Sequence, residues 1–341
     1  MSVKRIKLPN QLLVLGNTKY LFGEVRKADD LWRVVRTFDC NGVATVCITT
    51  FGLFGFIFPN SSRLASIDIL EYSGPGHAPK EGMDNDDDIH HLQDKRILFI
   101  NFVLAAFFGR VIAKAHTALT GALYSGQDKI TAFALVNGAI TIQPTEILDQ
   151  LINTKTLALN AGKLRHRILT DTDIDDGISY IKHLLLRHQE FAYADLQSCM
   201  LMNYQAAILH NQQQAAASFA LNFSVIESLA REVFLAYGFI DGTEAQSFAK
   251  SSCEINHKVS NKTFKNMKLC KVLEILGDNG LLDTYLCKRL EVARKKRNNL
   301  MHKGIVLDPR ESGDLQSAVR DIWDLLIDSP FELTAGWAYR R

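Results

Sequence analysis

Residues 213–238 carry the clearest structural signal of the chain, because large apolar residues recur there at steps of four and three. At about 100° per residue, this spacing places them on one side of an α-helix. Gly238 follows as a typical helix end. The segment therefore predicts a long helix that buries a single face. The residues of this face are Phe219, Phe223, Ile226, Ala230, Val233 and Tyr237.

Other helical signals surround this segment, while strand signals fade after Pro144. A polar loop between Asp241 and Asn261 is long enough to indicate an insertion or a contact loop. The C-terminal half is thus predicted to be an all-helical bundle, residues 171–341. Its expected helices, with one short helix before it, span residues 144–152, 173–189, 192–210, 213–238, 262–277, 280–302 and 312–327.

The N-terminal part, residues 1–170, has a mixed pattern. Asn137-Gly138 lies between two apolar runs and predicts a β-hairpin over residues 130–142. A loop is expected over residues 73–88, followed by a helix over about 92–118. The sequence therefore predicts an α+β protein, with a mixed α/β domain before the helical one. Strands are expected at 19–25, 43–50, 52–58 and 66–71.

The charge balance limits the kinds of partner. The 341 residues include 39 basic and 37 acidic side chains, a formal net charge of +2. This excludes a polycationic coat for nucleic acids but allows a local basic site. The motifs of P-loop, Rossmann, α/β-hydrolase and zincin enzymes are missing from the sequence.

The cysteines and the apolar stretches indicate a cytoplasmic protein. The six cysteines form no C-x-x-C pair, so reduced thiols are expected. The basic start is followed by Pro9 and only a short apolar patch, which does not resemble a signal peptide. Residues 43–58 and 97–113 are apolar but too short or too polar to cross a membrane, and we expect a buried strand pair and a buried helix.

The helix expected at 280–302 contains an arginine on its apolar face. Arg297 falls within the arc of its apolar positions, where a guanidinium, which keeps its proton, must be paired or employed. Asn298 and His302 lie one turn apart beside it, so their side chains can converge. Gly304 ends the helix. The apolar positions are Leu282, Leu286, Leu290, Ala293 and Met301.

This Arg297-Asn298-x3-His302 arrangement resembles the Arg-x(4–6)-His motif of the HEPN superfamily. Members are all-helical domains, often metal-independent ribonucleases of toxin–antitoxin and phage-defence systems. The resemblance covers about residues 200–330, in which a long helix pair, the motif helix and a closing helix follow one another. It does not extend to residues 1–170, whose expected role is sensing or substrate selection.

The resemblance implies an RNA-cleaving site that two protomers form together, without a metal or cofactor. His302 is then the general acid or base, Arg297 stabilises charge on the phosphate, and Asn298 orients either group. Its implied partners are RNA, a second copy of the chain and an antitoxin or another defence-system protein, with no membrane. The implied RNA-binding residues are Lys295, Lys296 and Lys303.

Two other interpretations of the motif remain open. One is a non-catalytic, HEPN-like module that dimerises or binds RNA or a partner. The other is an ordinary basic helix end with a solvated histidine. Arg110 and His116 also fit the looser spacing, although Arg110 is interpreted as a helix-end residue.

Two acidic features are also candidate functional sites. Glu227 lies beside the apolar face of its helix and is expected to be solvated or to pair with Arg297 or Arg231. The segment Asp84–Asp88, followed by two histidines, resembles a cation loop but lacks the glycine and the final glutamate that calcium binding needs. A solvated acidic loop is therefore expected there.

Overall fold

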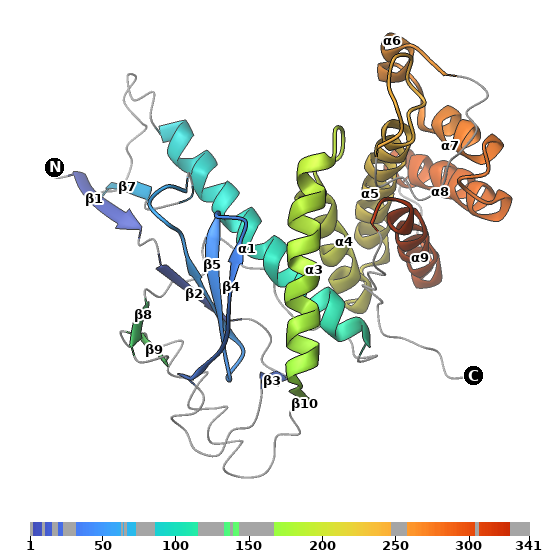
Figure 1. Ribbon diagram of the computed structural model, residues 1–341. Helices are drawn as coiled ribbons and strands as arrows, with labels where there is room; N and C mark the ends of the chain where they lie inside the picture. The colour runs from blue at the N-terminus through green and yellow to red at the C-terminus, as the bar shows by residue number, and fades with distance from the viewer. Residues whose placement is uncertain are drawn as a thin grey trace. The chain divides into compact units, whose positions relative to one another are not determined.

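The computed structural model describes twelve stretches of the chain (Figure 1), and they fall into two compact units. One unit comprises residues 1–104 and 121–178, the other residues 105–120 and 179–341. The boundary thus differs from the expected domain boundary at residue 170, since residues 105–120 pack with the second unit. The described residues are 3–8, 11–15, 20–22, 32–62, 64, 67–72, 86–114, 133–136, 139–142, 167–246, 258–303 and 307–327.

The first unit contains a four-stranded antiparallel sheet with the strand order β2-β6-β5-β4. Its strands are β2 (Gln11–Leu15), β4 (Val34–Cys40), β5 (Ala44–Thr49) and β6 (Leu53–Ile57). Successive residues of β5 and β6 are buried, so both faces of this pair are covered. The prediction of a buried strand pair in residues 43–58 is confirmed.

Three smaller strand pairs belong to the same unit. β1 (Val3–Leu8) pairs antiparallel with β7 (Ile67–Tyr72), and β3 (Tyr20–Phe22) pairs parallel with β10 (Arg167–Leu169). The strands β8 (Phe133–Val136) and β9 (Ala139–Ile142) are antiparallel, with Val136 opposite Ala139. This register confirms the hairpin predicted from Asn137-Gly138. Strands β1, β2, β4 and β10 were not expected.

Helix α1 (Asp86–Lys114) begins earlier than expected, and its predicted end near residue 118 lies outside the described residues. Asp86, Asp87 and Asp88 are in its first turn, so the prediction of a loop through residue 88 is wrong there. Carboxylates are favoured at a helix start because the backbone N–H groups there carry partial positive charge. Its middle part is buried as predicted, and Phe99 packs edge-on against Phe58. In the described part of the chain, none of the helices is long and apolar enough to span a membrane.

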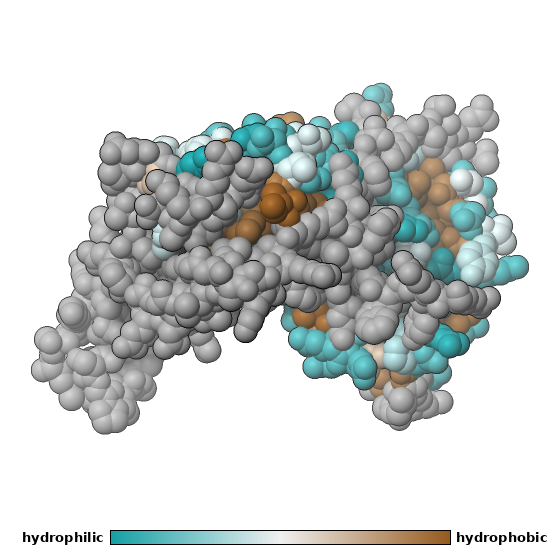
Figure 2. Space-filling view, turned by 90° about the horizontal axis from the view of Figure 1, so that it is seen from below, coloured by the Kyte–Doolittle hydropathy of each residue, from teal (hydrophilic) through white to brown (hydrophobic). Residues whose placement is uncertain are grey.

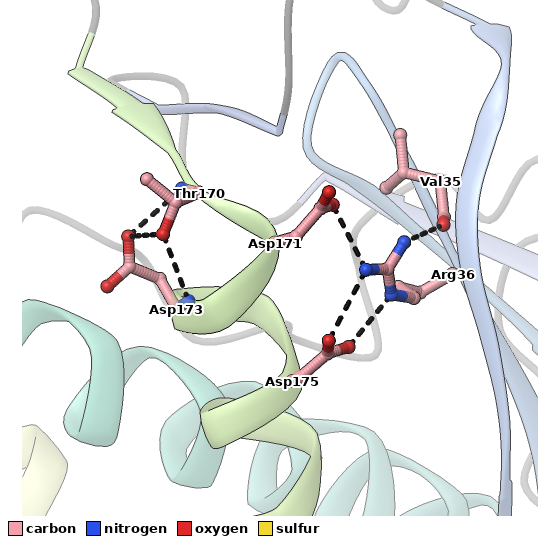
Figure 3. A network of polar contacts seen from close by, with 6 residues as sticks. All are labelled: Val35, Arg36, Thr170, Asp171, Asp173 and Asp175. Atoms are coloured by element: carbon pink, nitrogen blue, oxygen red, sulfur yellow. Dashed lines mark hydrogen bonds and ion pairs between the residues drawn. The ribbon is translucent and has the colours of Figure 1, made fainter.

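Arg36 on β4 connects the sheet to the start of helix α3 (Asp171–Glu190), as Figure 3 shows. Its Nε donates to Asp175 at 2.8 Å, and Nη2 lies 3.0 Å from Asp171. The start of α3 is also capped, since Thr170 and Asp173 exchange backbone-to-side-chain hydrogen bonds. A hydrogen bond from Arg36 lowers the pKa of the Asp175 carboxyl below its ordinary value.

Replacing Arg36 by Gln should raise the pKa of Asp175 toward its ordinary value. Because the folded-state pKa is lowered, the ion pair stabilises the fold fully above the ordinary pKa of Asp. This stabilisation is lost as the pH falls through the lowered value. An NMR titration of the side-chain carboxyls measures the change, with Asp173 as the control that should not respond. An unchanged Asp175 midpoint in Arg36→Gln would contradict the assignment.

The second unit is built around helix α5, which packs against α4, α7, α8 and α9 (Figure 1). After Leu169 all described regular elements are helices, apart from one bridge between Ile240 and Val259. On the face seen in Figure 2, hydrophilic residues cover most of the described surface of these helices. The bounds are α4 (Leu196–Asn211), α5 (Ala215–Ala236), α6 (Asn261–Lys265), α7 (Leu269–Asp278), α8 (Thr284–Lys303) and α9 (Pro309–Leu326).

Helix α5 is more deeply buried than its sequence indicated. The predicted apolar face, from Phe219 to Tyr237, is buried throughout. Val225, Leu229 and Phe234 beside this face are buried as well, so the buried side of the helix is wider than predicted. Gly238 ends the helix as predicted, with φ of 76°. An added Cβ there would lie 2.9 Å from the backbone N of Ala245, which leaves room only for glycine.

The helix expected over 262–277 is divided into α6 and α7. Arg231 on α5 donates from Nη2 to the carbonyl oxygen of Met267 at 2.8 Å, and its guanidinium lies 5.8 Å from the ring centre of Phe264. This carbonyl lies in the connection between the two helices, where Arg231 supplies it with a donor. The connection after Lys265 is thus fixed by a residue more than thirty positions earlier.

Glu232 is a fully buried carboxylate on α5. It accepts hydrogen bonds from three successive backbone N–H groups between α3 and α4, those of Ala192, Tyr193 and Ala194, at 2.9, 2.6 and 2.7 Å. Such charge-assisted bonds satisfy the two oxygens of the carboxylate and the three N–H donors of the loop. Glu232 thus fixes the α3–α4 connection against the central helix.

Replacing Glu232 by Ala should lower the free energy of unfolding by about 3–5 kcal/mol, because three N–H groups lose their acceptor. Glu227→Ala on the same helix is the control. Its half-exposed side chain lies 3.9 Å from Arg231, and its loss should cost under about 1 kcal/mol. Urea denaturation followed by circular dichroism measures both. Equal losses in the two variants would contradict the role of Glu232.

Candidate functional site

Helix α8 carries the predicted motif near its C-terminal end. It begins at Thr284 rather than at residue 280, since Gly280 has a φ of 73° and Asp283 accepts a hydrogen bond from the backbone N of Leu286 at 2.6 Å. These features are typical of a turn followed by a helix cap. Leu290 and Ala293 are buried, and the helix packs against α5, α7 and α9. The predicted apolar face is confirmed at these positions.

Arg297 lies on a different side of the end of α8 from His302. Arg297 is half-buried, one turn beyond Ala293, and Asn298 is also half-buried, whereas His302 is exposed. Five helical positions separate Arg297 from His302, a rotation of about 140°. One protomer therefore does not bring the guanidinium and the imidazole onto one helix face. Asn298 and His302, four positions apart, do share a side.

Most basic side chains next to the motif are paired with acidic ones. Arg294 donates to both carboxylate oxygens of Glu291, at 2.8 and 2.7 Å, and Lys295 lies 3.9 Å from the same carboxylate. The hydrogen bond from Arg294 lowers the pKa of Glu291. Lys296 is paired with Glu311 on α9. The side chain of Lys303 lies outside the described residues.

Arg297 differs from these neighbours. Among the residues that the structure describes, none forms a hydrogen bond or an ion pair with its side chain. The same holds for the side chains of Asn298 and His302. A half-buried guanidinium that no described carboxylate pairs with is suited to bind an anion, such as a phosphate, through two parallel hydrogen bonds.

The other candidate residues either contact protein side chains or lie outside the described residues. Arg110 lies over the ring of Tyr180, 5.8 Å from its centre, while His116 is outside the described residues. Glu227 lies 3.9 Å from Arg231, one of its two expected partners. Asp84 is outside the described residues. In the described parts of the chain, no group of three His, Cys, Asp or Glu side chains is placed to hold a metal ion.

The sequence did not indicate a groove between α7 and α8. Its volume is about 620 Å³, and none of the motif residues lines it. Val292 on its edge is 52% exposed and Tyr285, two turns earlier on α8, is 70% exposed. In the sequence, these two apolar residues off the buried face of α8 are the signal that could have indicated the groove. The lining includes Cys270, Leu273 and Glu274 of α7 with Cys287, Lys288 and Val292 of α8.

Comparisons of the chain with protein-family models, with curated proteins and with solved structures gave no match.

Proposed function

We propose that the protein is a metal-independent endoribonuclease of HEPN type, with a site that two copies of the chain complete. The observation that carries the proposal is the state of Arg297. Its basic neighbours on α8 have carboxylate partners, whereas no described residue pairs with Arg297. Its charge is therefore available for a phosphodiester.

The rotation between Arg297 and His302 is the argument for a second copy. Two motifs facing each other across a two-fold axis supply two guanidinium groups and two imidazoles to one phosphate. One His302 takes the proton of the ribose 2′-hydroxyl, and the 2′-oxygen forms a bond to phosphorus. The bond to the 5′-oxygen breaks, and the other His302 donates a proton to that oxygen. The products are a 2′,3′-cyclic phosphate and a 5′-hydroxyl.

The acidic residues near the motif support a scheme without a metal. Glu291 is occupied by Arg294 and Lys295, and Glu311 by Lys296. Neutralising the charge on the phosphate then falls to Arg297, with Asn298 orienting the phosphate or His302. Lys295 and Lys303 are the proposed RNA contacts, whereas Lys296 is paired with Glu311. We place the protein in the cytoplasm as a toxin or antiviral effector, with an antitoxin or another defence protein as partner.

A second candidate function is a HEPN-like module that binds RNA or a partner without cutting it. The ion pairs of Lys295 and Lys296 favour the form that binds a partner, because paired lysines add little to the attraction of a polyanion such as RNA. It differs from the first candidate in having no role for the imidazole of His302.

We predict that Arg297→Ala and His302→Ala each reduce RNA cleavage by about 10³-fold or more while the fold is retained. The double variant should lose no more than either single one, since the residues act as a unit. Cleavage of labelled RNA is the measurement, with circular dichroism as the folding check and Lys288→Ala as a control for charge. In cells, the wild type should arrest growth and His302→Ala should not. Full activity of folded His302→Ala would favour the binding module.

We also predict that cleavage persists in EDTA and that one 2′-deoxy substitution at the cut site abolishes it, because the attacking hydroxyl is then missing. Mass spectrometry of the upstream fragment should find a 2′,3′-cyclic phosphate. A matched RNA with the substitution one nucleotide away serves as the control. Cleavage of the substituted site at the normal rate, or a requirement for a divalent cation, would refute the His302 scheme.

A further inference from the structure

Helices α8 and α9 are joined by two sets of polar contacts, two turns of α8 apart. The first is the ion pair between Lys296 and Glu311. The second involves Arg289, which donates to the carbonyl oxygen of Asp314 and lies 3.8 Å from the carboxylate of Asp321. Lys296 directly precedes Arg297, whereas Arg289 is remote from the motif. The two sets thus offer a comparison between a contact beside the site and one far from it.

Glu311 has two functions at the start of α9. It is the third residue of the helix, and its Oε2 accepts a hydrogen bond from the backbone N of Asp308 at 3.3 Å. The Asp308 side chain in turn accepts from the backbone N of Glu311, which completes a capping box, and also from the backbone N of Arg310 at 2.8 Å. The other oxygen of Glu311, Oε1, holds Lys296. One carboxylate therefore fixes the first turn of α9 and a residue near the end of α8.

The end of α8 needs such a contact. The last four carbonyl groups of a helix lack partners within the helix, so terminal turns open readily. His302 is in this turn, exposed and without a described side-chain partner. Both Lys296 and Glu311 are partly buried, with side chains 36% and 28% exposed, so water screens their attraction less than at an open surface.

We propose that Glu311 is a positioning residue for the motif. By holding Lys296 against the first turn of α9, it keeps the last turns of α8 formed and thereby fixes the directions of Arg297 and His302. Its effect on catalysis rests on the proposed ribonuclease function, whereas its effect on the helix end does not. In this assignment Lys296 is a structural partner of Glu311 instead of an RNA contact.

The test uses Glu311→Gln in the full chain. Glutamine can still accept the hydrogen bond of the capping box, but it lacks the charge that holds Lys296. Asp321→Asn is the matched control, since it weakens the other contact between the same helices. Amide hydrogen exchange by mass spectrometry should be about fivefold faster at residues 298–303 in Glu311→Gln and unchanged there in Asp321→Asn. Unchanged exchange in Glu311→Gln would overturn the proposal.

Kinetics separates positioning from RNA binding. Positioning predicts that Glu311→Gln lowers kcat by about tenfold with KM unchanged, and that Lys296→Met does the same. If Lys296 instead contacts RNA, freeing it in Glu311→Gln should tighten RNA binding and steepen its salt dependence without lowering kcat. That result would overturn the proposal.

The two proposals fail in different ways. Faster exchange in Glu311→Gln, with no cleavage by the wild type, supports the role of Glu311 at the helix end and refutes the ribonuclease. Cleavage that depends on His302 but is insensitive to Glu311→Gln, with unchanged exchange, refutes positioning alone.

Discussion

The broad buried side of helix α5 is the constraint on which the helical unit depends. A central helix of this kind has to satisfy any polar group that it carries into the core, and each bond made for this purpose selects one arrangement of the neighbouring helices. Ser218 donates to the carbonyl oxygen of Ala206 on α4 at 2.8 Å and receives a hydrogen bond from Ser312 on α9 at 2.6 Å. Asn203 on α4 donates to Asn222 at 3.0 Å. These bonds fix α4 and α9 along α5, while apolar contacts alone would tolerate sliding.

The same helix determines where the candidate site lies. Arg231 holds the connection between α6 and α7 at the carbonyl of Met267, and α7 packs against α8. The face of α8 that contains Leu290 and Ala293 is buried, and Arg297 follows on that face one turn beyond Ala293. There the guanidinium is half-buried.

The charges around the site differ from what a count of basic residues implies. Six lysines and arginines cluster in the sequence near the motif, yet three of them, Arg294, Lys295 and Lys296, are paired with Glu291 or Glu311, which offset two of the positive charges. Part of the positive charge thus forms ion pairs within α8 and between α8 and α9. What is left for a substrate is concentrated at Arg297 and at the helix end, which favours binding of one phosphate over binding along a polyanion.

The sequence alone determined the elements whose signals are local. The spacing of apolar residues predicted α5 and the buried face of α8, and Asn137-Gly138 predicted the hairpin, because side-chain periodicity and turn preference act over a few residues. It also predicted a chain with strands first and helices after. The tertiary structure decided what depends on distant partners. These include the strand order β2-β6-β5-β4, the break between α6 and α7, and the pairing of Lys296 with Glu311. The width of the buried side of α5 was likewise decided there, since a helix carries no local mark of how many neighbours will cover it. Nor does a lysine in a basic run indicate that a carboxylate fifteen residues later will hold it.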